Sequence, residues 1–209
     1  MEEREERPNR RERERNRHRQ EILGAAQRVV DARGIDGVTI DEVAREAEFA
    51  VGSIYKHFKS KDELVSVLVV AQVDRYLDEL DALLAGPAPF PELLDAVARL
   101  TYGRHQRSRP LLMAWMGLPG APTTPLSDEL LADRRARGRA LFDALIARGQ
   151  AEGALAPGER RLLSIAFVGM LLSFSKASLF AERPLEGDLP GLAVRIFLHG
   201  AGHPVAAAS

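Results

Sequence analysis

Apolar residues recur at helical spacing along most of the chain, which predicts a protein built from helices. The first such set lies at i, i+3, i+4, i+7 and i+8 and comprises Ile22, Ala25, Ala26, Val29 and Val30. Gly34 follows where a helix commonly ends, because glycine readily takes the left-handed conformation of a terminating residue. We therefore expect a first helix that ends near Gly34.

Two short helices and the start of a longer one are expected next. Their inner faces are formed by Ile40, Val43, Ala44 and Ala47, and then by Ile54 and Phe58. Thr39 and Glu42 have capping-box spacing, in which the hydroxyl accepts from the N–H of residue 42 and the carboxylate reaches back to residue 39. Ser60 and Glu63 repeat this spacing. Two well-defined helix starts around a short helix indicate a helix-turn-helix reader of DNA.

Residues 20–66 resemble the DNA-binding domain of the TetR family of transcriptional regulators. The family commonly shows a Thr-capped second helix and a third helix close to Gly-Thr-Leu-Tyr-x-x-Phe. The matching residues here are Gly34, Gly37, Thr39, Ile40, Val43, Ala44, Gly52, Ser53, Ile54, Tyr55, His57, Phe58, Lys61, Glu63 and Leu64. The resemblance implies a sequence-specific DNA-binding regulator, most often a dimeric repressor on a palindromic operator.

The resemblance also implies roles for individual residues. The base-edge positions would be Val51, Gly52, Ser53 and Lys56, and the phosphate positions would be Thr39, Tyr55, His57 and Lys61. The chain departs from the family where Gly-Val-Ser is common and Glu48-Phe49-Ala50 stands instead. Ala50 lacks a capping side chain, and Glu48 adds negative charge and lacks the freedom of glycine for positive φ.

Residues 1–19 form a charged arm. From residue 7 to residue 19 arginine exceeds glutamate by five charges, although the whole chain has a formal net charge of −1. The arm is either a solvated, disordered tail or a continuation of the first helix through Glu–Arg pairs. As a basic segment next to a DNA reader, it would reach phosphates or the minor groove.

The remaining chain, residues 67–209, reads as a larger helical region. Helices are expected at Asp62–Leu84, 90–107, 110–117, Ser127–Gly149, Glu159–Ala181 and Pro190–Gly200. The helix from Ser127 carries a polar face rich in Arg134, Arg135, Arg137 and Arg139. The predicted fold is therefore all-α, with an N-terminal three-helix domain at 20–66 and a second helical domain for effector binding and dimerisation.

In TetR regulators this second region holds a small-molecule pocket and a dimer interface. By that resemblance, a largely apolar effector would contact Tyr102, His105, Leu112, Met113, Trp115, Met116, Phe167 and Met170. The dimer would use Leu163, Leu171, Phe174, Ile196 and Phe197. The same apolar residues also suit an ordinary hydrophobic core.

Composition narrows the remaining alternatives. The chain has no cysteine and no apolar N-terminal segment, which favours a cytoplasmic protein without disulfides. Its five histidines are scattered, and no catalytic or phosphate-binding motif stands out, so neither enzyme activity, a cofactor nor a metal is expected. A small helical enzyme, or a helical interaction protein with a non-functional DNA reader, remains the alternative.

Overall fold

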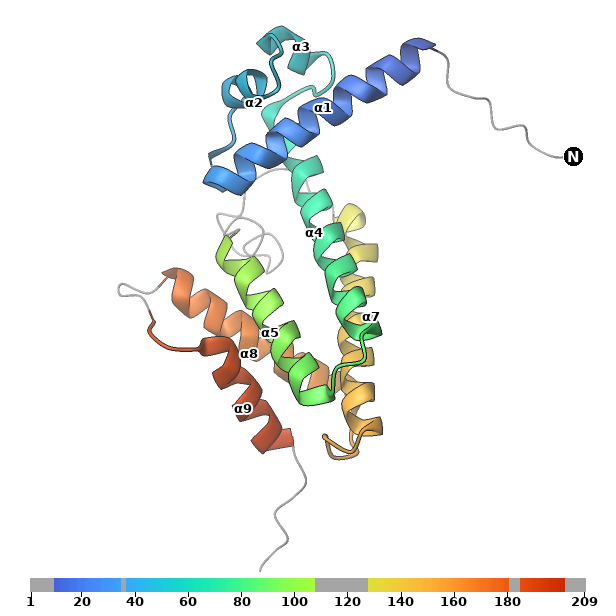
Figure 1. Cartoon of the computed structure of the whole chain (residues 1–209), viewed down its shortest axis with the longest axis vertical. Coiled ribbons are helices and arrows are strands. Elements are labelled where there is room, and N and C mark those ends of the chain that lie inside the picture. The colour runs from blue at the N-terminus through green and yellow to red at the C-terminus, as the bar shows by residue number, and fades with distance from the viewer. Residues whose placement is uncertain (1–9, 35–36, 108–127, 181–184, 202–209) are drawn as a thin grey trace, which may run out of the picture. The chain divides into compact units, whose positions relative to one another are not determined.

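The computed structural model describes residues 10–34, 37–107, 128–180 and 185–201 of the 209-residue chain (Figure 1). These residues form helices and no strand, so the fold is all-α as predicted. The helices are α1 (Arg10–Arg33), α2 (Ile40–Glu46), α3 (Val51–Tyr55), α4 (Lys61–Ala85), α5 (Phe90–Arg107), α7 (Asp128–Ala151), α8 (Arg160–Phe180) and α9 (Leu189–Ala201).

The chain divides into two compact units. One unit runs to Ala71 and the other begins at Gln72, so the division falls inside the continuous helix α4. The first unit contains α1, α2, α3 and the start of α4, and the second contains the rest of α4 with α5, α7, α8 and α9.

The first unit has a small core made from every one of its helices. Its fully buried side chains include Ile22, Val38, Val43, Ile54, Phe58 and Leu64. Gly34 ends α1 with φ of +73°, and its N–H donates to the carbonyl oxygen of Val30 at 2.8 Å. The helical periods and the first helix end are therefore those that the sequence predicts.

In each of the two predicted capping boxes, only one of the two expected hydrogen bonds forms. The N–H of Glu42 donates to Thr39 Oγ1 at 3.2 Å, but the Glu42 carboxylate pairs with Arg33 and Arg45 instead of returning to residue 39. At the start of α4, the N–H of Glu63 donates to Ser60 Oγ at 3.1 Å, and Glu63 Oε2 accepts from the N–H of Lys59. Arginines within reach compete for the first carboxylate, since a charged partner outweighs a neutral N–H.

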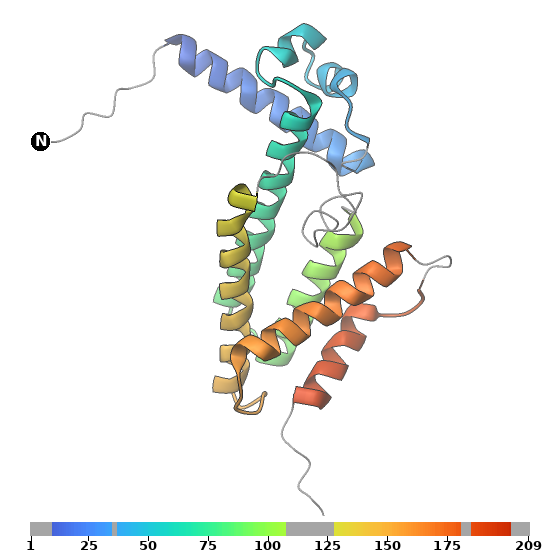
Figure 2. The same cartoon turned by 180° about the vertical axis from the view of Figure 1, so that it is seen from behind.

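The second unit packs α5, α8 and α9 against one another, with α7 beside α8 (Figure 2). Its core is apolar and centres on three phenylalanines: Phe167 lies between Phe142 and Phe197, at ring-centroid distances of 6.5 and 5.0 Å. The helix bounds differ by no more than three residues from those predicted. The helix expected at 110–117 lies outside the described residues.

Candidate functional site

The third helix presents its polar side to solvent on a buried apolar support. Ile54 and Phe58 are almost fully buried, and their four-residue spacing anchors the helix in the core of the first unit. The opposite side leaves Val51 38% exposed and Tyr55 51% exposed, with Lys56 exposed beside them. A short helix held from behind, with its outer side chains unpacked, suits insertion into a DNA groove.

The other predicted DNA contacts lie on this helix or next to it. Gly52, Lys61 and the capping residue Thr39 are exposed, whereas Ser53 and His57 are half-buried. A Cβ built on Gly52 meets no atom within 4 Å, so the fold itself does not require glycine there. All eight predicted positions fall on α3, its flanking residues, the α2 cap or the first residue of α4.

The turn between α2 and α3 requires a backbone conformation that is unfavourable for the residues in it. Glu48 adopts φ of +58°, a left-handed conformation that glycine takes without penalty. Ala50 occupies the N-cap of α3 and makes no side-chain cap bond. Both departures from the family pattern therefore have the structural consequence expected from the sequence.

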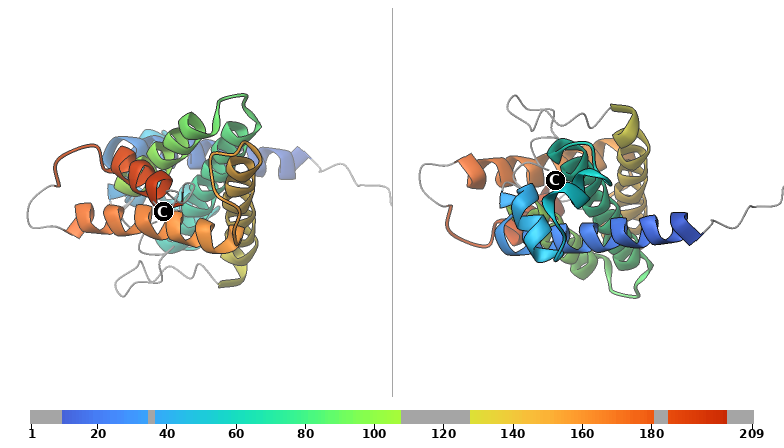
Figure 3. Two further views of the ribbon diagram at one scale, coloured as in Figure 1. Left: turned by 90° about the horizontal axis from the view of Figure 1, so that it is seen from below. Right: turned by 90° about the horizontal axis from the view of Figure 1, so that it is seen from above.

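Part of the charged arm is a structural element of the first unit. Helix α1 begins at Arg10, and its first two turns, residues 10–17, are exposed beyond α2 and α3 (Figure 3, right). Arg19 behaves differently, since its Nη1 donates to the carbonyl oxygen of His57 at 2.7 Å. Its guanidinium also lies 4.3 Å from the centroid of the Phe58 ring.

His57 sits in a positive environment next to this contact. Partial burial lowers its pKa below the usual value, and the neighbouring His18, Arg15, Arg19 and Lys56 lower it further. The ring centroids of His18 and His57 are 6.1 Å apart. The end of the recognition segment therefore carries a concentration of positive charge, which favours an anionic partner.

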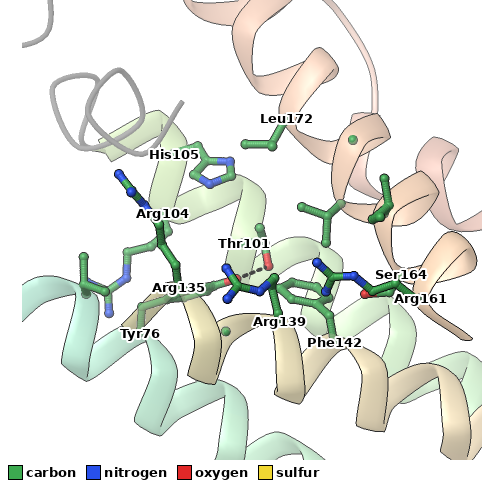
Figure 4. Close-up of a pocket in the computed structure, with 15 residues that line it drawn as sticks. Tyr76, Thr101, Arg104, His105, Arg135, Arg139, Phe142, Arg161, Ser164 and Leu172 are labelled. Carbon is green, nitrogen blue, oxygen red and sulfur yellow. Dashed lines mark hydrogen bonds between the residues drawn. The ribbon is translucent and has the colours of Figure 1, made fainter. Parts of the chain in front are cut away.

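The second unit contains a cavity of about 350 Å³ between α4, α5, α7 and α8 (Figure 4). Its wall is largely apolar and includes Val73, Phe142, Ile165, Val168 and Leu172. The volume is at the small end of the range of roughly 300–1,000 Å³ that is usual for ligand pockets. The cavity is therefore suited to a small molecule.

Four arginines also line this cavity: Arg104, Arg135, Arg139 and Arg161. The sequence gives a partial signal for two of them, in the arginine-rich face of α7. That face divides: Arg134 and Arg137 turn to α4 and pair with Asp74 and Asp78, each at 2.8 Å. Arg135 and Arg139, four residues apart and so on one side of the helix, line the cavity.

Neutral polar groups complete the lining. Burial lowers the pKa of His105 to about 4, so the ring is uncharged at neutral pH, and its Nδ1 lies 3.0 Å from Ser175 Oγ. Burial raises the pKa of Tyr76 to about 12, and its hydroxyl lies 3.0 Å from Thr101 Oγ1 (Figure 4). These groups offer hydrogen bonds without adding charge.

Of the predicted effector residues that the structure describes, only His105 lies at this cavity. His105 lines it, whereas the Tyr102 hydroxyl bonds to Ser178 Oγ at 2.6 Å. Phe167 is completely buried in the core of the second unit, and Met170 packs against that core. The four remaining residues of that prediction, Leu112, Met113, Trp115 and Met116, lie outside the described residues.

The residues predicted for dimerisation differ in their exposure. Leu171 and Phe197 are buried within their own unit, and Leu163 and Phe174 are half-buried against its core, whereas Ile196 is 48% exposed. The apolar side chains that α8 and α9 leave most exposed are Leu162, Ile165, Leu192 and Ile196. The sequence did not indicate that Leu162 and Leu192 are exposed, because α8 and α9 are too uniformly apolar for their periodicity to reveal the outer face, and Ile165 also lines the cavity.

Helix α8 is unusually apolar for a surface helix. Arg160–Leu179 is long and apolar enough to cross a membrane by length and composition, and 22% of it is buried. It is the single helix of that kind among the described residues. Exposed apolar surface of this kind is typical of sites where another surface packs.

Comparison with known proteins agrees with the geometry of the first unit. Residues 22–68 match the family of bacterial regulatory proteins, tetR family. The HTH-type transcriptional repressor KstR of Mycobacterium tuberculosis is 30% identical over 140 residues, which is 65% of this chain and 59% of KstR. The chain spans about half the length of the curated relatives it matches, 48% and 59% for two of them.

Solved structures share the fold at low sequence identity. A TetR-family regulator from Mesorhizobium loti has a TM-score of 0.67 and 21% identity, covering 90% of this chain and 98% of that one. The regulator FadR from Bacillus subtilis, solved with stearoyl-CoA, has a TM-score of 0.61 and 17% identity, covering 89% and 98%.

The first unit has the helix-turn-helix arrangement of a DNA-binding domain, and a larger helical unit follows it along the chain. Residues 22–68 therefore carry the DNA-binding domain of the tetR family of bacterial regulatory proteins, and the chain shares the fold of solved TetR-family regulators.

Proposed function

We propose that the protein is a dimeric repressor that binds a palindromic operator and is released from it by a small-molecule effector. The observation that carries this proposal is the third helix, with Val51, Tyr55 and Lys56 exposed within the segment that matches the family. The repressor assignment is supported by KstR, a relative that is named a repressor. Such a protein works in the cytoplasm, where its DNA is.

The proposal gives each of the eight predicted residues a role at the DNA. Val51 and Lys56 would meet base edges, an apolar contact to a thymine methyl and a donor to guanine, with Gly52 and Ser53 allowing close approach. Thr39, Tyr55, His57 and Lys61 surround the helix and would hold phosphates, fixing its register on the duplex.

Dimerisation is supported by the exposed apolar faces of α8 and α9. A two-fold interface uses the same patch on both copies, so Leu162 and Ile196 would be covered by their counterparts. Exposed Ala166 and Ser173 share a side of α8 with Leu162 and, being small, allow a second helix to approach closely. Two recognition helices would then lie about 34–36 Å apart, one DNA turn.

The cavity in the second unit supports the effector role. FadR of Bacillus subtilis, which shares the fold, was solved with stearoyl-CoA, so this architecture holds a ligand in at least one relative. An effector that prefers the conformation unsuited to the operator must weaken DNA binding, and by linkage DNA weakens effector binding by the same factor.

The stoichiometry of the DNA complex tests this proposal. The wild-type protein is expected to sediment as a dimer and to bind an operator duplex as two chains. Ile196→Asp places a charge on the exposed face of α9, so it should yield monomers with much weaker operator binding. Arg195→Asp, at the neighbouring exposed position, is the control for added charge. A wild-type monomer that binds the operator with full affinity would contradict the dimer.

A further inference from the structure

The cavity of the second unit has an excess of positive charge. Four of its lining residues are arginines, and its described lining contains no carboxylate. An ordinary apolar pocket carries few charged groups, because a charge costs free energy wherever it loses water without a partner. Of these arginines Arg104 is buried, whereas Arg139 and Arg161 are exposed and keep their charge accessible to a ligand in the cavity.

Nearby acids compensate only part of this charge. Arg104 donates to Glu79 at 2.9 Å, and Arg161 lies 3.6 Å from Asp143. Arg139 makes no ion pair or hydrogen bond with any residue that the structure describes. In contrast, Arg134 and Arg137 on the same helix both have aspartate partners on α4. On the cavity side of α7, Arg139 therefore carries a charge that no described carboxylate compensates.

Arg104, the buried arginine of the cavity, also carries positive charge that its neighbours only partly compensate. Arg104 is 9% exposed, and its Nε has no hydrogen-bond partner among the described residues. Burial lowers the pKa of Arg104, Glu79 opposes this change, and the like charges of Arg75 and Arg107 add to it. A negative group in the cavity would relieve this repulsion.

Apolar surface lies next to the charge. Figure 4 shows the Arg139 and Arg161 side chains, from α7 and α8, near the Phe142 ring. Val168 and Leu172 continue the apolar wall along α8. The cavity thus offers hydrophobic contact and anion recognition side by side, and planar guanidinium groups suit the two oxygens of an acid.

We infer that the cavity binds an amphipathic anion, a small carboxylic acid whose apolar body contacts Phe142 and Val168 and whose acid group pairs with Arg139 and Arg161. This inference rests on the proposed function, since it names the chemical class of the effector. It narrows the earlier expectation of a largely apolar effector by adding one negative charge.

The test compares three probes that share an eight-carbon alkyl chain and differ in their head groups: octanoate, 1-octanol and octylamine. Calorimetric titration of the 209-residue chain at neutral pH should show octanoate binding at least about tenfold more tightly than 1-octanol, because charge-assisted hydrogen bonds are the stronger ones. Octylamine should bind most weakly, since it brings a like charge.

Two variants locate the effect. The double variant Arg139→Gln with Arg161→Gln should lose the preference for octanoate over 1-octanol while still binding 1-octanol. Arg137→Gln, on the same helix but facing Asp78, should keep it. Both altered arginines are exposed, so the fold should persist, which thermal unfolding checks. Arg139→Lys retains the charge and should keep part of the preference.

Three results would overturn the inference: equal binding of octanoate and 1-octanol by the wild type, an unchanged preference in the double variant, or no binding of any probe. Operator binding is measured in the same preparations. If DNA binds and octanoate does not, the inference fails and the proposed function stands. If octanoate binds through the arginines and DNA does not, the proposed function fails instead.

Discussion

Arg19 and His57 are joined by a hydrogen bond of 2.7 Å, from Arg19 Nη1 to the carbonyl oxygen of His57. His57 directly follows the C-cap of α3, where helix carbonyls lack intrahelical partners. An arginine from a low-complexity stretch therefore stabilises the end of the recognition segment.

Arg19→Gln is expected to lower the free energy of unfolding by about 1–2 kcal/mol, because it removes a charged hydrogen bond and the contact with Phe58. Urea unfolding measures the change. Arg13→Gln is the matched control, since Arg13 is exposed on the same helix, and it should leave stability unchanged. Unchanged stability of Arg19→Gln would instead assign Arg19 to a solvated tail.

Glu48→Gly should stabilise the protein by about 1 kcal/mol, because glycine adopts the φ of +58° without strain. It should also strengthen DNA binding at low salt, because it removes a negative charge next to the recognition helix α3. Glu48→Gln removes the charge and retains the strain, so it should strengthen DNA binding without stabilising the fold. Unfolding and DNA titrations on both variants separate the two effects, and a destabilised Glu48→Gly would refute the strain.

Gly52→Ala separates folding from DNA recognition. The added Cβ meets nothing within 4 Å in the free protein, so stability should be unchanged or should rise by up to about 1 kcal/mol through helix propensity. DNA affinity should fall, because the methyl group occupies the space that the duplex backbone or a base edge needs. Gly158→Ala also adds a Cβ in open space, but it lies in the second unit, so it should leave DNA binding unchanged. Undiminished affinity of Gly52→Ala would remove Gly52 from the interface.

Base and phosphate contacts should respond differently to alanine. Tyr55→Ala and Lys61→Ala should weaken binding to every sequence. Loss of the Lys61 charge should also reduce the slope of log affinity against log salt concentration by about one. Lys56→Ala should instead relax the preference at particular base pairs. Binding to a panel of operator variants across a range of salt concentrations measures both effects. A changed base preference in Lys61→Ala, or uniform weakening in Lys56→Ala, would contradict the roles proposed for them.

Much of the fold could be predicted because helical period and helix ends are local properties. The cap at Thr39 and the end at Gly34 depend on neighbouring residues, and both form where the sequence places them. The cost of Glu48 in the turn was also visible, since few side chains tolerate positive φ.

The second unit was less predictable because its sites depend on contacts between distant helices. Four helices contribute to the cavity, and only the divided face of α7 gave a signal for Arg139. Helix α8 is apolar on several sides, so sequence alone could not separate buried Leu171 from exposed Leu162. Which side of such a helix is buried is decided by its neighbours.

The central claim is tested most directly by selecting bound sites from random duplex DNA with the purified protein. Anisotropy titrations then measure the affinity for the selected sites across a range of salt concentrations. We expect enrichment of an inverted repeat whose half-sites lie about one helical turn apart, roughly 34–36 Å, and an affinity that falls steeply as salt rises. Recovery of no preferred sequence, with weak binding to all duplexes, would contradict a DNA-reading function and leave the cavity of the second unit as the functional site.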